Sequence, residues 1–411
     1  FANGVSHRIV QDDMEGIQEV INWLSFIPIK ANCLPPIMRT RDNPVRSVTF
    51  EVPADGLYDP RSLIEGLVQD GIWLSGLFDR GSFIETLGGW AKTVITGRAR
   101  LGGYPVGVIA VEVRTVDLII PADPANLSST AQSVKQAGQV WFPDSAFKTA
   151  QAIRDFSNGE NLPIFILANW RGFSGGQRDL YEQVLKFGAM IVDALKDLKQ
   201  PVFVYLPPGS ELRGGAWVVV DSQINPNFIE MYADPSARGG ILEPEGIVGV
   251  KFRQHHLYSL MERLDPTCQS LVDELENSTT PAEKDEISKR LATRRAKLLP
   301  VFRQIACQFA DAHDRPGRMK AKNVIREIVP WSRSRAYFYH RLRRLLAEAE
   351  LIGLIKGYRL NWIEKKTKLS LLLLDSFNVD LSSANDEGIF DKLSEHNHAI
   401  KNQIKELNIA L

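Results

Sequence analysis

The feature that most constrains the fold is an alternation of short apolar runs with longer helical patterns across residues 46–253. β-Branched side chains are frequent in the short runs, and loops rich in glycine and proline separate the elements. Short β-branched runs predict strands, and helices placed between strands are typical of an α/β core. The sequence therefore predicts an α/β fold for this part of the chain.

The positions of the elements follow from the same pattern. Apolar runs of strand length predict strands at 106–113, 118–121, 164–169, 202–206, 217–220 and 247–252. A helical spacing of apolar residues predicts helices at 146–156 and 179–198, and a further helix that begins within 82–90. No internal repeat of fixed period is present, which argues against a solenoid.

Two flanking regions differ from this core. In residues 1–45, Asp12 precedes an amphipathic pattern that predicts a capped helix, and a loop rich in proline and arginine follows. Residues 254–411 are almost entirely helical in pattern, and residues 289–344 hold sixteen basic side chains against three acidic ones. We interpret this run as a solvated helical arm whose charge is balanced by acidic stretches elsewhere. An arm that helps to receive an anionic ligand or partner stays open as the alternative.

Composition argues against several classes of partner. With 49 basic and 49 acidic side chains and no recognised motif in the basic run, we expect no nucleic-acid partner. The apolar stretch 369–374 is far shorter than the ~18 residues of a membrane span, and no other apolar run approaches that length. Three widely spaced cysteines fit reduced thiols in a cytoplasmic compartment better than a disulfide framework. The chain opens without Met, and we expect it to be a piece of a longer protein.

A search for acid–base, metal or nucleotide chemistry finds no motif. None of the seven histidines stands in a metal-ligand spacing and no CxxC pair exists, so we expect no metal site. Ser174 lies in a Gly-Phe-Ser-Gly-Gly sequence that approaches but does not match a nucleophile elbow. His7 fits a packed or capping side chain better than a base. No glycine-lysine loop for phosphates is present.

Two glycine-rich turns remain, and each follows a predicted strand. The first spans 169–179, with Gly175 and Gly176 ahead of a predicted helix, and the second spans 209–217. A glycine pair lets backbone N–H groups approach a ligand oxygen with no Cβ in the way, and a following helix adds the positive end of its dipole. Such a turn can form an oxyanion hole or an anion cradle. Ordinary loop chemistry is the alternative, because glycines at strand ends are common.

Cationic side chains accompany these turns. Arg171 lies inside the first turn, where its guanidinium can pair with a carboxylate through two hydrogen bonds, or can form a structural salt bridge. Lys251 and Arg253 alternate at the end of the predicted strand 247–252, which would place both on one face. Two cations on one face suit a phosphate-bearing ligand, and they suit an exposed strand end equally well.

At these residues the sequence resembles the carboxyltransferase region of the large, multidomain acetyl-CoA carboxylases of eukaryotes. The strings that carry the resemblance are FDRGSFIETLGGWAKTVITGRARLGGYPVGVIAVEVRT (78–115), IPADPANL (120–127), ILANWRGFSGGQRDLYEQVLKFGAMIVDAL (166–195), ELRGGAWVVVD (211–221) and EPEGIVGVKFR (243–253). Weaker similarity runs back to Gly4 and forward to about Ile355. Beyond Ile355 the sequence departs from the tail expected for the family.

The resemblance implies a crotonase-like fold of the ClpP/crotonase type, a β–β–α superhelix in two related halves, with an appended and mainly helical basic region. Residues 1–45 would end the N-terminal subdomain, and residues 46–411 would form the C-terminal one. Its crotonase-like core would lie at 46–253, and a helical arm and tail at 254–411. The resemblance also implies a homodimer in which the N half of one chain faces the C half of its partner.

The implied activity is the carboxyltransferase half-reaction, which moves the carboxyl group of carboxybiotin to acetyl-CoA and gives malonyl-CoA for fatty-acid synthesis. Biotin would be carried on a separate carrier domain, and a separate biotin carboxylase domain would use ATP, Mg and bicarbonate. Such chemistry needs two oxyanion holes and positioned charge rather than a protein base, in agreement with the failed search for one. Transfer to another acyl-CoA such as propionyl-CoA, a different crotonase-fold acyl-CoA enzyme and a non-catalytic scaffold are the alternatives.

The same resemblance implies roles for particular residues. The backbone N–H groups of Gly215 and Ala216 would form the oxyanion hole for biotin, and Arg171 would hold the substrate carboxylate. Lys251 and Arg253 would bind the CoA phosphates. Gly175 and Gly176 are weaker candidates for cofactor binding. The oxyanion hole for the acetyl thioester would lie in the N half.

Overall fold

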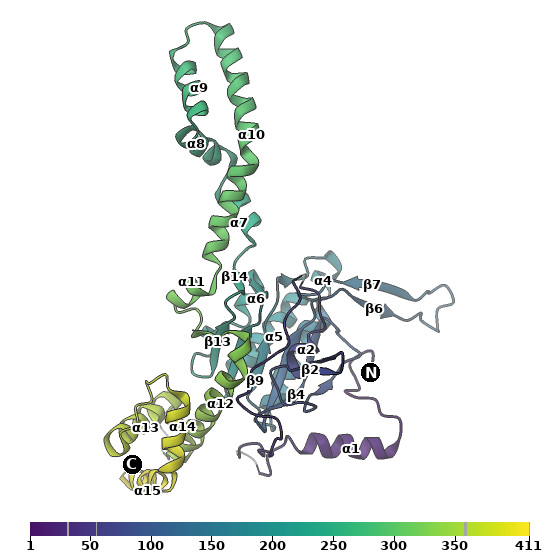
Figure 1. The fold of residues 1–411 in the computed structure, drawn as a ribbon. Coiled ribbons are helices and arrows are strands. Elements are labelled where there is room, and N and C mark those ends of the chain that lie inside the picture. Colours follow the sequence, from purple (N-terminus) through teal and green to yellow (C-terminus); the bar gives the residue numbers. More distant parts are fainter. Residues whose placement is uncertain (31–32, 55, 357–359, 411) are drawn as a thin grey trace.

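The computed structural model describes residues 1–30, 33–54, 56–356 and 360–410, and a seven-stranded sheet forms its centre (Figure 1). The strand order is β15-β13-β11-β9-β5-β4-β3. β3, β4 and β5 pair antiparallel, and the pairings from β5 to β15 are parallel. The strands are β3 (Ile84–Thr86), β4 (Val94–Leu101), β5 (Tyr104–Val111), β9 (Ile164–Leu167), β11 (Val202–Leu206), β13 (Ile229–Ala233) and β15 (Glu327–Ile328).

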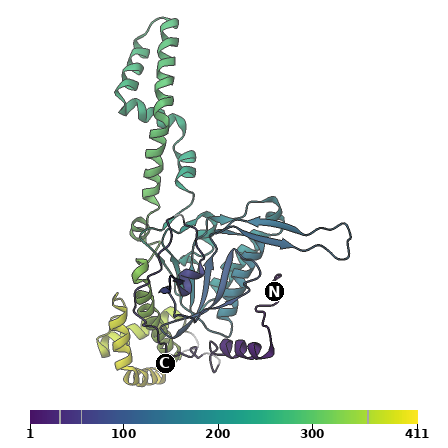
Figure 2. The ribbon, with the colours of Figure 1, turned by 45° about the vertical axis from the view of Figure 1, so that its right-hand side comes forward.

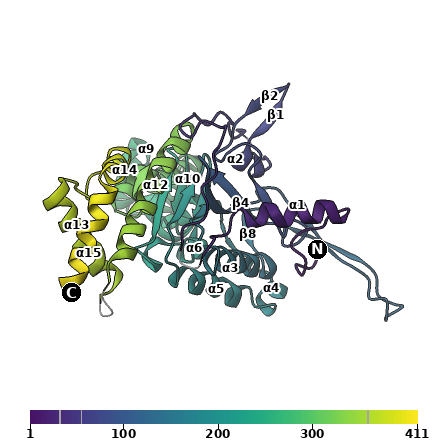
Figure 3. The ribbon, with the colours of Figure 1, turned by 90° about the horizontal axis from the view of Figure 1, so that it is seen from below.

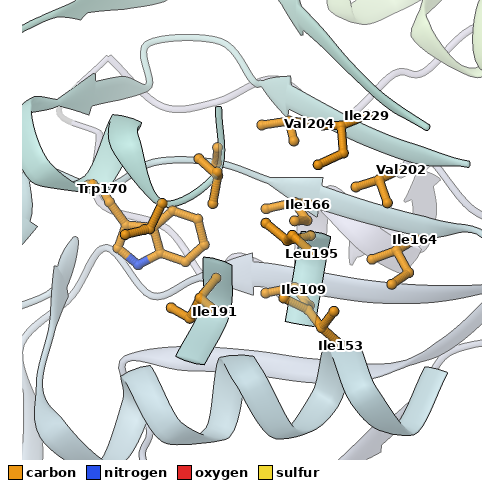
Figure 4. Close-up of a cluster of buried hydrophobic side chains, with 14 of the residues drawn as sticks. Ile109, Ile153, Ile164, Ile166, Trp170, Ile191, Leu195, Val202, Val204 and Ile229 are labelled. Atoms are coloured by element: carbon orange, nitrogen blue, oxygen red, sulfur yellow. The ribbon is translucent and has the colours of Figure 1, made fainter. Parts of the chain in front are cut away.

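Period-two alternation divides the strand side chains between two cores. Ile166 of β9 belongs to the cluster drawn in Figure 4, whereas its neighbour Phe165 belongs to the cluster on the other face. Helices α3 (Pro143–Ser157) and α5 (Val184–Lys196) pack side by side over the first face (Figure 3). Helix α12 (Trp331–Leu354) covers the second face. The predicted α/β core is therefore confirmed.

Most of the predicted elements within this core are also confirmed. The predicted strands at 106–113, 164–169 and 202–206 are β5, β9 and β11, and the predicted helix at 146–156 is α3. The predicted helix at 179–198 is interrupted. Helix α4 (Gln177–Tyr181) ends before α5 begins, because Gln183 adopts a left-handed backbone conformation with φ 66°.

The predicted strand at 247–252 is wrong, because these residues lie in helix α7 (Pro244–Lys251) and the residue that follows it. Pro244 occupies the first turn of α7, where a missing N–H leaves no helical hydrogen bond unmade. Val248 is buried and anchors the helix to the arm described below. Tertiary packing therefore overrides the strand preference of the β-branched residues in this segment.

Two further predicted elements are wrong. The predicted strand at 217–220 coincides with the end of the short helix α6 (Gly214–Val218) and the residues after it. The helix expected to begin within 82–90 is instead the edge strand β3, followed by a turn in which Leu87 has φ 58°. In both places, a turn with a positive φ angle sets the backbone, and apolar spacing alone does not reveal it.

Two small parallel sheets extend the carboxyl end of the main sheet. β8 (Val140–Trp141) pairs with β10 (Gly172–Phe173), and β12 (Glu211–Arg213) pairs with β14 (Arg238–Gly240). β10 follows β9 and β12 follows β11, and β9 and β11 are parallel neighbours. Parallel neighbours carry their following turns at the same edge, which brings the two glycine-rich turns together.

An arm of three helices stands out from the core (Figures 1 and 2). It consists of α8 (Gln254–Leu264), α9 (Pro266–Asn277) and the 33-residue helix α10 (Pro281–His313). Its own apolar cluster joins α7 to these helices. The predicted helical arm is confirmed, although the proposed boundaries between subdomains stay predictions.

The remaining elements lie around this frame. A hairpin of β6 (Val116–Ile120, where a strand was predicted) and β7 (Gln132–Gln136) projects from the core (Figure 1). Asp12 caps α1, because its side chain accepts a 2.9 Å hydrogen bond from the Glu15 N–H, as predicted. The others are α1 (Asp13–Leu24), α2 (Arg61–Glu65), β1 (Leu67–Gln69), β2 (Ile72–Leu74), η1 (Ser222–Ile224), α11 (Pro316–Ala321), α13 (Trp362–Phe377), α14 (Asp386–Glu395) and α15 (Asn397–Ala410). Within the described residues, none of the helices is long and apolar enough to cross a membrane.

The basic run is only partly a solvated surface. Arg294 on the arm pairs with Asp265 at 2.7 Å, so acidic residues elsewhere do balance some of its charge. Arg335, Arg341 and Arg344 on α12 are buried, which contradicts a fully solvated run. These arginines are structural ties between α12 and the rest of the chain.

Arg335 gives a direct stability prediction. Its fully buried guanidinium donates to the Asp79 carboxylate at 2.7 Å and to the carbonyl oxygens of Leu77 and Asn43. We expect Arg335→Met to lower the free energy of unfolding by about 3–5 kcal/mol, because Asp79 keeps a buried charge without its main partner. Chemical denaturation measures the loss, and the exposed Arg333→Met is the control, with an expected change within about 0.5 kcal/mol. Equal stability of the two variants would contradict this role.

Candidate functional site

The two glycine-rich turns meet at the carboxyl edge of the sheet. The Arg213 N–H donates to the Trp170 carbonyl oxygen at 2.9 Å, and the Asn169 side chain accepts from the Glu211 N–H at 3.0 Å. A Cβ placed on Gly215 would lie 3.5 Å from the ring of Phe173, in ordinary contact. Segments about forty residues apart in sequence therefore form one surface.

The second turn leads directly into helix α6, which the sequence did not predict. Gly214 begins the helix with φ 47°, a conformation that favours glycine, and the exposed Gly215 follows it. The side chain of Ala216 is fully buried in the core and anchors the turn. Because the first N–H groups of a helix lack partners within it, Gly215 and Ala216 offer two donors at the positive end of α6. This arrangement can stabilise an oxyanion.

Arg171 lies beside this turn with about half of its side chain exposed, at 51%. Its Nε lies 3.9 Å from the Glu211 carboxylate and its Nη1 lies 3.6 Å from that of Glu243. Neither distance is a tight, two-hydrogen-bond pair. Two loosely placed carboxylates therefore orient the guanidinium and leave it able to receive an incoming carboxylate.

Arg213 and Asp314 form a buried ion pair behind the turn. The Arg213 side chain is 3% exposed, and its Nη1 donates to the Asp314 carboxylate and to the Leu242 carbonyl oxygen. Burial is the largest single effect and acts to lower the pKa of the Arg213 guanidinium, but the hydrogen bonds and negative charges of Asp314 and Glu211 together outweigh it and raise that pKa. Arg213 therefore stays charged next to the site.

Gly175 and Gly176 lie at the exposed end of the first turn, where Gly176 is the N-cap residue of α4. The Ser174 hydroxyl donates to the Asp179 carboxylate in the first turn of that helix, and it also accepts from the Gly176 N–H at 3.3 Å. Ser174 thus caps a turn, in agreement with the weak case for a serine nucleophile.

Lys251 and Arg253 are not placed as the sequence predicted. Lys251 is the last residue of α7 and Arg253 is the N-cap residue of α8, so they do not share a strand face. Both are exposed, and an α-helix of this length puts Lys251 roughly 10 Å along α7 from Pro244. Arg253 and Arg303 line a cavity of about 240 Å³ at the base of the arm. The two cations therefore lie apart from the turns, at the far end of α7.

A second cavity, of about 300 Å³, lies against α6. Trp217, Val218 and Ile241 contribute apolar surface, and Arg318 and Lys322 contribute positive charge. Gly214 also lines this cavity, so the cavity lies directly beside the first turn of α6. A ligand with an apolar body and a polar head fits such a mixed lining.

Sequence reasoning missed four residues of this site. They are Glu211, Arg213, Glu243 and Asp314. Glu211 and Arg213 alternate on the strand before the glycine pair, and this alternation was the one available signal. Asp314 is a hundred residues distant, so only the fold reveals its contact.

Residues 1–346 match the carboxyl transferase domain family. The chain is 56% identical over 347 residues to "Acetyl-CoA carboxylase" of Schizosaccharomyces pombe, covering 84% of this chain and 15% of that protein. It is 48% identical over 417 residues to "Acetyl-CoA carboxylase, mitochondrial" of Saccharomyces cerevisiae, covering 100% of this chain and 18% of that protein. "Acetyl-CoA carboxylase" of Dictyostelium discoideum is also 48% identical, over 425 residues, covering 99% of this chain and 18% of that protein. The chain thus spans less than a fifth of the length of these relatives.

Among solved structures, the fold is similar to that of a transcarboxylase 12S with hydrolysed methylmalonyl-coenzyme A bound. The TM-score is 0.56 at 18% sequence identity, covering 86% of this chain and 54% of that one. A likeness at this identity concerns the fold, and it confirms the predicted crotonase-like architecture with an appended helical region. The chain belongs to the carboxyl transferase domain family.

Proposed function

We propose that the chain is part of the carboxyltransferase component of a biotin-dependent acetyl-CoA carboxylase, which moves a carboxyl group from carboxybiotin to acetyl-CoA and yields malonyl-CoA. The observation that carries the proposal is the first turn of α6, with the donors of Gly215 and Ala216 beside the half-exposed Arg171. The printed names of the similar relatives favour acetyl-CoA over an alternative such as propionyl-CoA.

Each element of the site has a proposed role. Biotin, when bound, would carry the carboxyl group that is transferred. The N–H groups of Gly215 and Ala216 hold the biotin oxygen as negative charge develops on it. Arg171 orients the acyl carboxylate, and the cavity beside α6 offers apolar surface to the bound ligand. The proton of the acetyl methyl group would pass to the biotin nitrogen that has released the carboxyl group, so these steps require no protein base.

The CoA phosphates have a proposed site at the base of the arm. We assign CoA-phosphate binding to Lys251 at the end of α7 and to Arg253 at the start of α8. Arg303 adds a third positive charge at the adjacent cavity. The position at the far end of α7 suits a long ligand whose acyl end reaches Arg171. Gly175 and Gly176 stay weaker candidates for contacts with the cofactor.

The proposed partners follow from the family. They are the biotin carboxyl carrier domain, a biotin carboxylase domain that uses ATP, Mg and bicarbonate, and a second copy whose N half faces this C half. Exposed apolar side chains on α6, α7 and α10 support the last of these; they are Val218, Val250, Val301, Ile305 and Phe309. A cytoplasmic compartment is proposed from the three free thiols, although the relative from Saccharomyces cerevisiae carries the word mitochondrial in its name.

The proposed activity is tested in the reverse direction on the full-length enzyme. We expect release of acetyl-CoA from malonyl-CoA to depend on an added free biotin derivative, which accepts the carboxyl group. The biotin carboxylase step is bypassed, so the result reports on this site alone. Release of acetyl-CoA at the same rate with and without the biotin derivative would contradict the proposal.

Arg171→Lys separates a substrate clamp from a structural salt bridge. Because the planar fork is lost while the charge is kept, we expect the half-saturating concentration of malonyl-CoA to rise roughly 10- to 100-fold. The melting temperature should change little, since Arg171 makes only long ion pairs and is half exposed.

The matched control is Arg178→Lys on α4. Arg178 is equally exposed and pairs with Glu182 at 2.8 Å, but it has no proposed contact with substrate. We expect wild-type kinetics from this variant. An unchanged half-saturating concentration in Arg171→Lys, together with a large fall in melting temperature, would show that Arg171 is structural.

A further inference from the structure

We propose that Arg213 and Asp314 are a positioning pair, which sets the first turn of α6 relative to Arg171 and fixes both to the base of the helical arm. The inference rests on the proposed function, because it assigns a role to residues behind the proposed oxyanion hole. Neither residue is proposed to touch substrate or biotin. Their effect on the reaction would act through Gly215, Ala216 and Arg171.

Arg213 links three segments that lie near Arg171. Its backbone N–H donates to Trp170, the residue before Arg171, at 2.9 Å. Its Nη1 donates to the Leu242 carbonyl oxygen at 3.2 Å, one residue before Glu243. Arg213 is itself the residue that precedes α6. Through its backbone and its buried side chain, Arg213 therefore joins the strand exit, the α6 start and the segment leading to α7.

The carboxylate of Glu211 is shared between two arginines. It lies 3.3 Å from the Nε of Arg213 and 3.9 Å from the Nε of Arg171. Asp314 supplies the second negative charge that Arg213 needs in its buried position. Without the charge of Asp314, Arg213 would attract the Glu211 carboxylate more strongly. Glu211 would then move away from Arg171, and the orientation of the Arg171 guanidinium would change.

The approach of Arg213 to Asp314 requires glycine at position 240, where any side chain would collide with the pair. Gly240 stands opposite Arg213 in the β12–β14 pairing. A Cβ on Gly240 would lie 2.7 Å from the Asp314 carboxylate and 3.1 Å from the Arg213 Nη1. The pair is therefore built into the packing between the two strands and the arm, rather than lying on a flexible surface.

Asp314 connects the pair to the arm. It is the C-cap residue of the 33-residue helix α10, and its backbone carbonyl accepts from the Gly239 N–H at 2.9 Å. The side chain of Asp314 thus contacts Arg213 of β12, and its backbone contacts Gly239 of β14. A displacement at the base of α10 would reach α6 through Arg213.

The test compares two ion pairs at the end of α10. Arg213 of β12 pairs with Asp314, and Arg238 of β14 pairs with Asp311. Asp314→Asn removes the charge behind α6 without changing the shape of the side chain. Asp311→Asn is the matched control, because Asp311 pairs with Arg238 at 2.6 Å across the same junction but has no recorded contact with α6 among the described residues. Both variants are made in the full-length enzyme and assayed for biotin-dependent release of acetyl-CoA from malonyl-CoA.

We expect Asp314→Asn to lower kcat about 10- to 100-fold, the scale of a small misplacement of catalytic donors, with KM for malonyl-CoA within about threefold. Hydrogen exchange at the N–H groups of Arg213 and Val220, which flank α6 and donate to the carbonyl oxygens of Trp170 and Trp217, should become faster in the same variant when followed by mass spectrometry. Asp311→Asn should change neither quantity. If Asp314→Asn does not fold, Arg213→Lys replaces it, since lysine keeps the charge but loses the fork that reaches several partners.

Two results would overturn the inference. One is wild-type amide exchange at Arg213 and Val220 in the variant, and the other is an equal effect of Asp314→Asn and Asp311→Asn. A wild-type enzyme without biotin-dependent activity would instead reject the proposed function. Amide exchange would still decide whether the pair positions α6, so the two failures are distinguishable.

Discussion

Gly215→Val is expected to lower the turnover of the full-length enzyme by about 10²–10³, the loss associated with one oxyanion-hole donor. The branched side chain would occupy the space that a biotin oxygen must enter to reach the N–H groups of α6. The fold should be kept, because Gly215 is exposed and a Cβ there makes only ordinary contact with Phe173 at 3.5 Å. Steady-state turnover and thermal melting of the same preparation measure the two effects.

Gly353→Val is the control for placing valine at an exposed helical glycine. Gly353 lies on α12 with no atom near the position of its Cβ. This control should show the small loss of stability expected of valine in a helix, with turnover close to that of wild type. Near-normal carboxyl transfer by a folded Gly215→Val enzyme would remove Gly215 from the site.

The 411-residue chain on its own is expected to be inactive with acetyl-CoA and biotin. The proposed reaction needs two oxyanion holes, and within the described residues we assign one, at α6. The resemblance to the carboxylases implies that the other lies in the N half of a partner chain. Turnover of the isolated chain, with and without an added N half, measures this dependence, and the added N half should restore some activity.

The isolated chain is also expected to self-associate. Exposed apolar residues such as Val218 on α6, Ile241 after β14 and Phe309 on α10 would be covered by the partner in the proposed dimer. Light scattering or sedimentation of the chain alone would detect the association. A clean monomer with full carboxyltransferase turnover would show that the interface proposal is wrong.

Local sequence patterns predicted the core well because local physics determines it. β9 and β11 are short and β-branched or aromatic, and α3 carries an apolar face at helical spacing. The failures lie where tertiary packing or a turn with a positive φ angle decides the backbone conformation. At 247–252, β-branched residues in helix α7 are held by packing against the arm, which a local pattern does not contain.

Part of the geometry of the candidate site could be expected from the sequence. The two glycine-rich turns follow parallel strands, so their meeting could be expected from topology. The start of α6 depends on a positive φ angle at Gly214, and the ion pair of Arg213 with Asp314 joins residues far apart in sequence. Lys251 and Arg253 were assigned to a strand, whereas they lie at the end of α7 and the start of α8.

The central claim is that the first turn of α6 and Arg171 form one carboxyl-transfer site with separate tasks. The most direct test is the dependence of acetyl-CoA release on malonyl-CoA concentration, measured with saturating biotin derivative for the wild type, Gly215→Val and Arg171→Lys. We predict that Gly215→Val lowers kcat with KM within about threefold, because its donors act mainly in the transition state. Arg171→Lys should mainly raise KM. Wild-type values of both kcat and KM in the two folded variants would contradict the account.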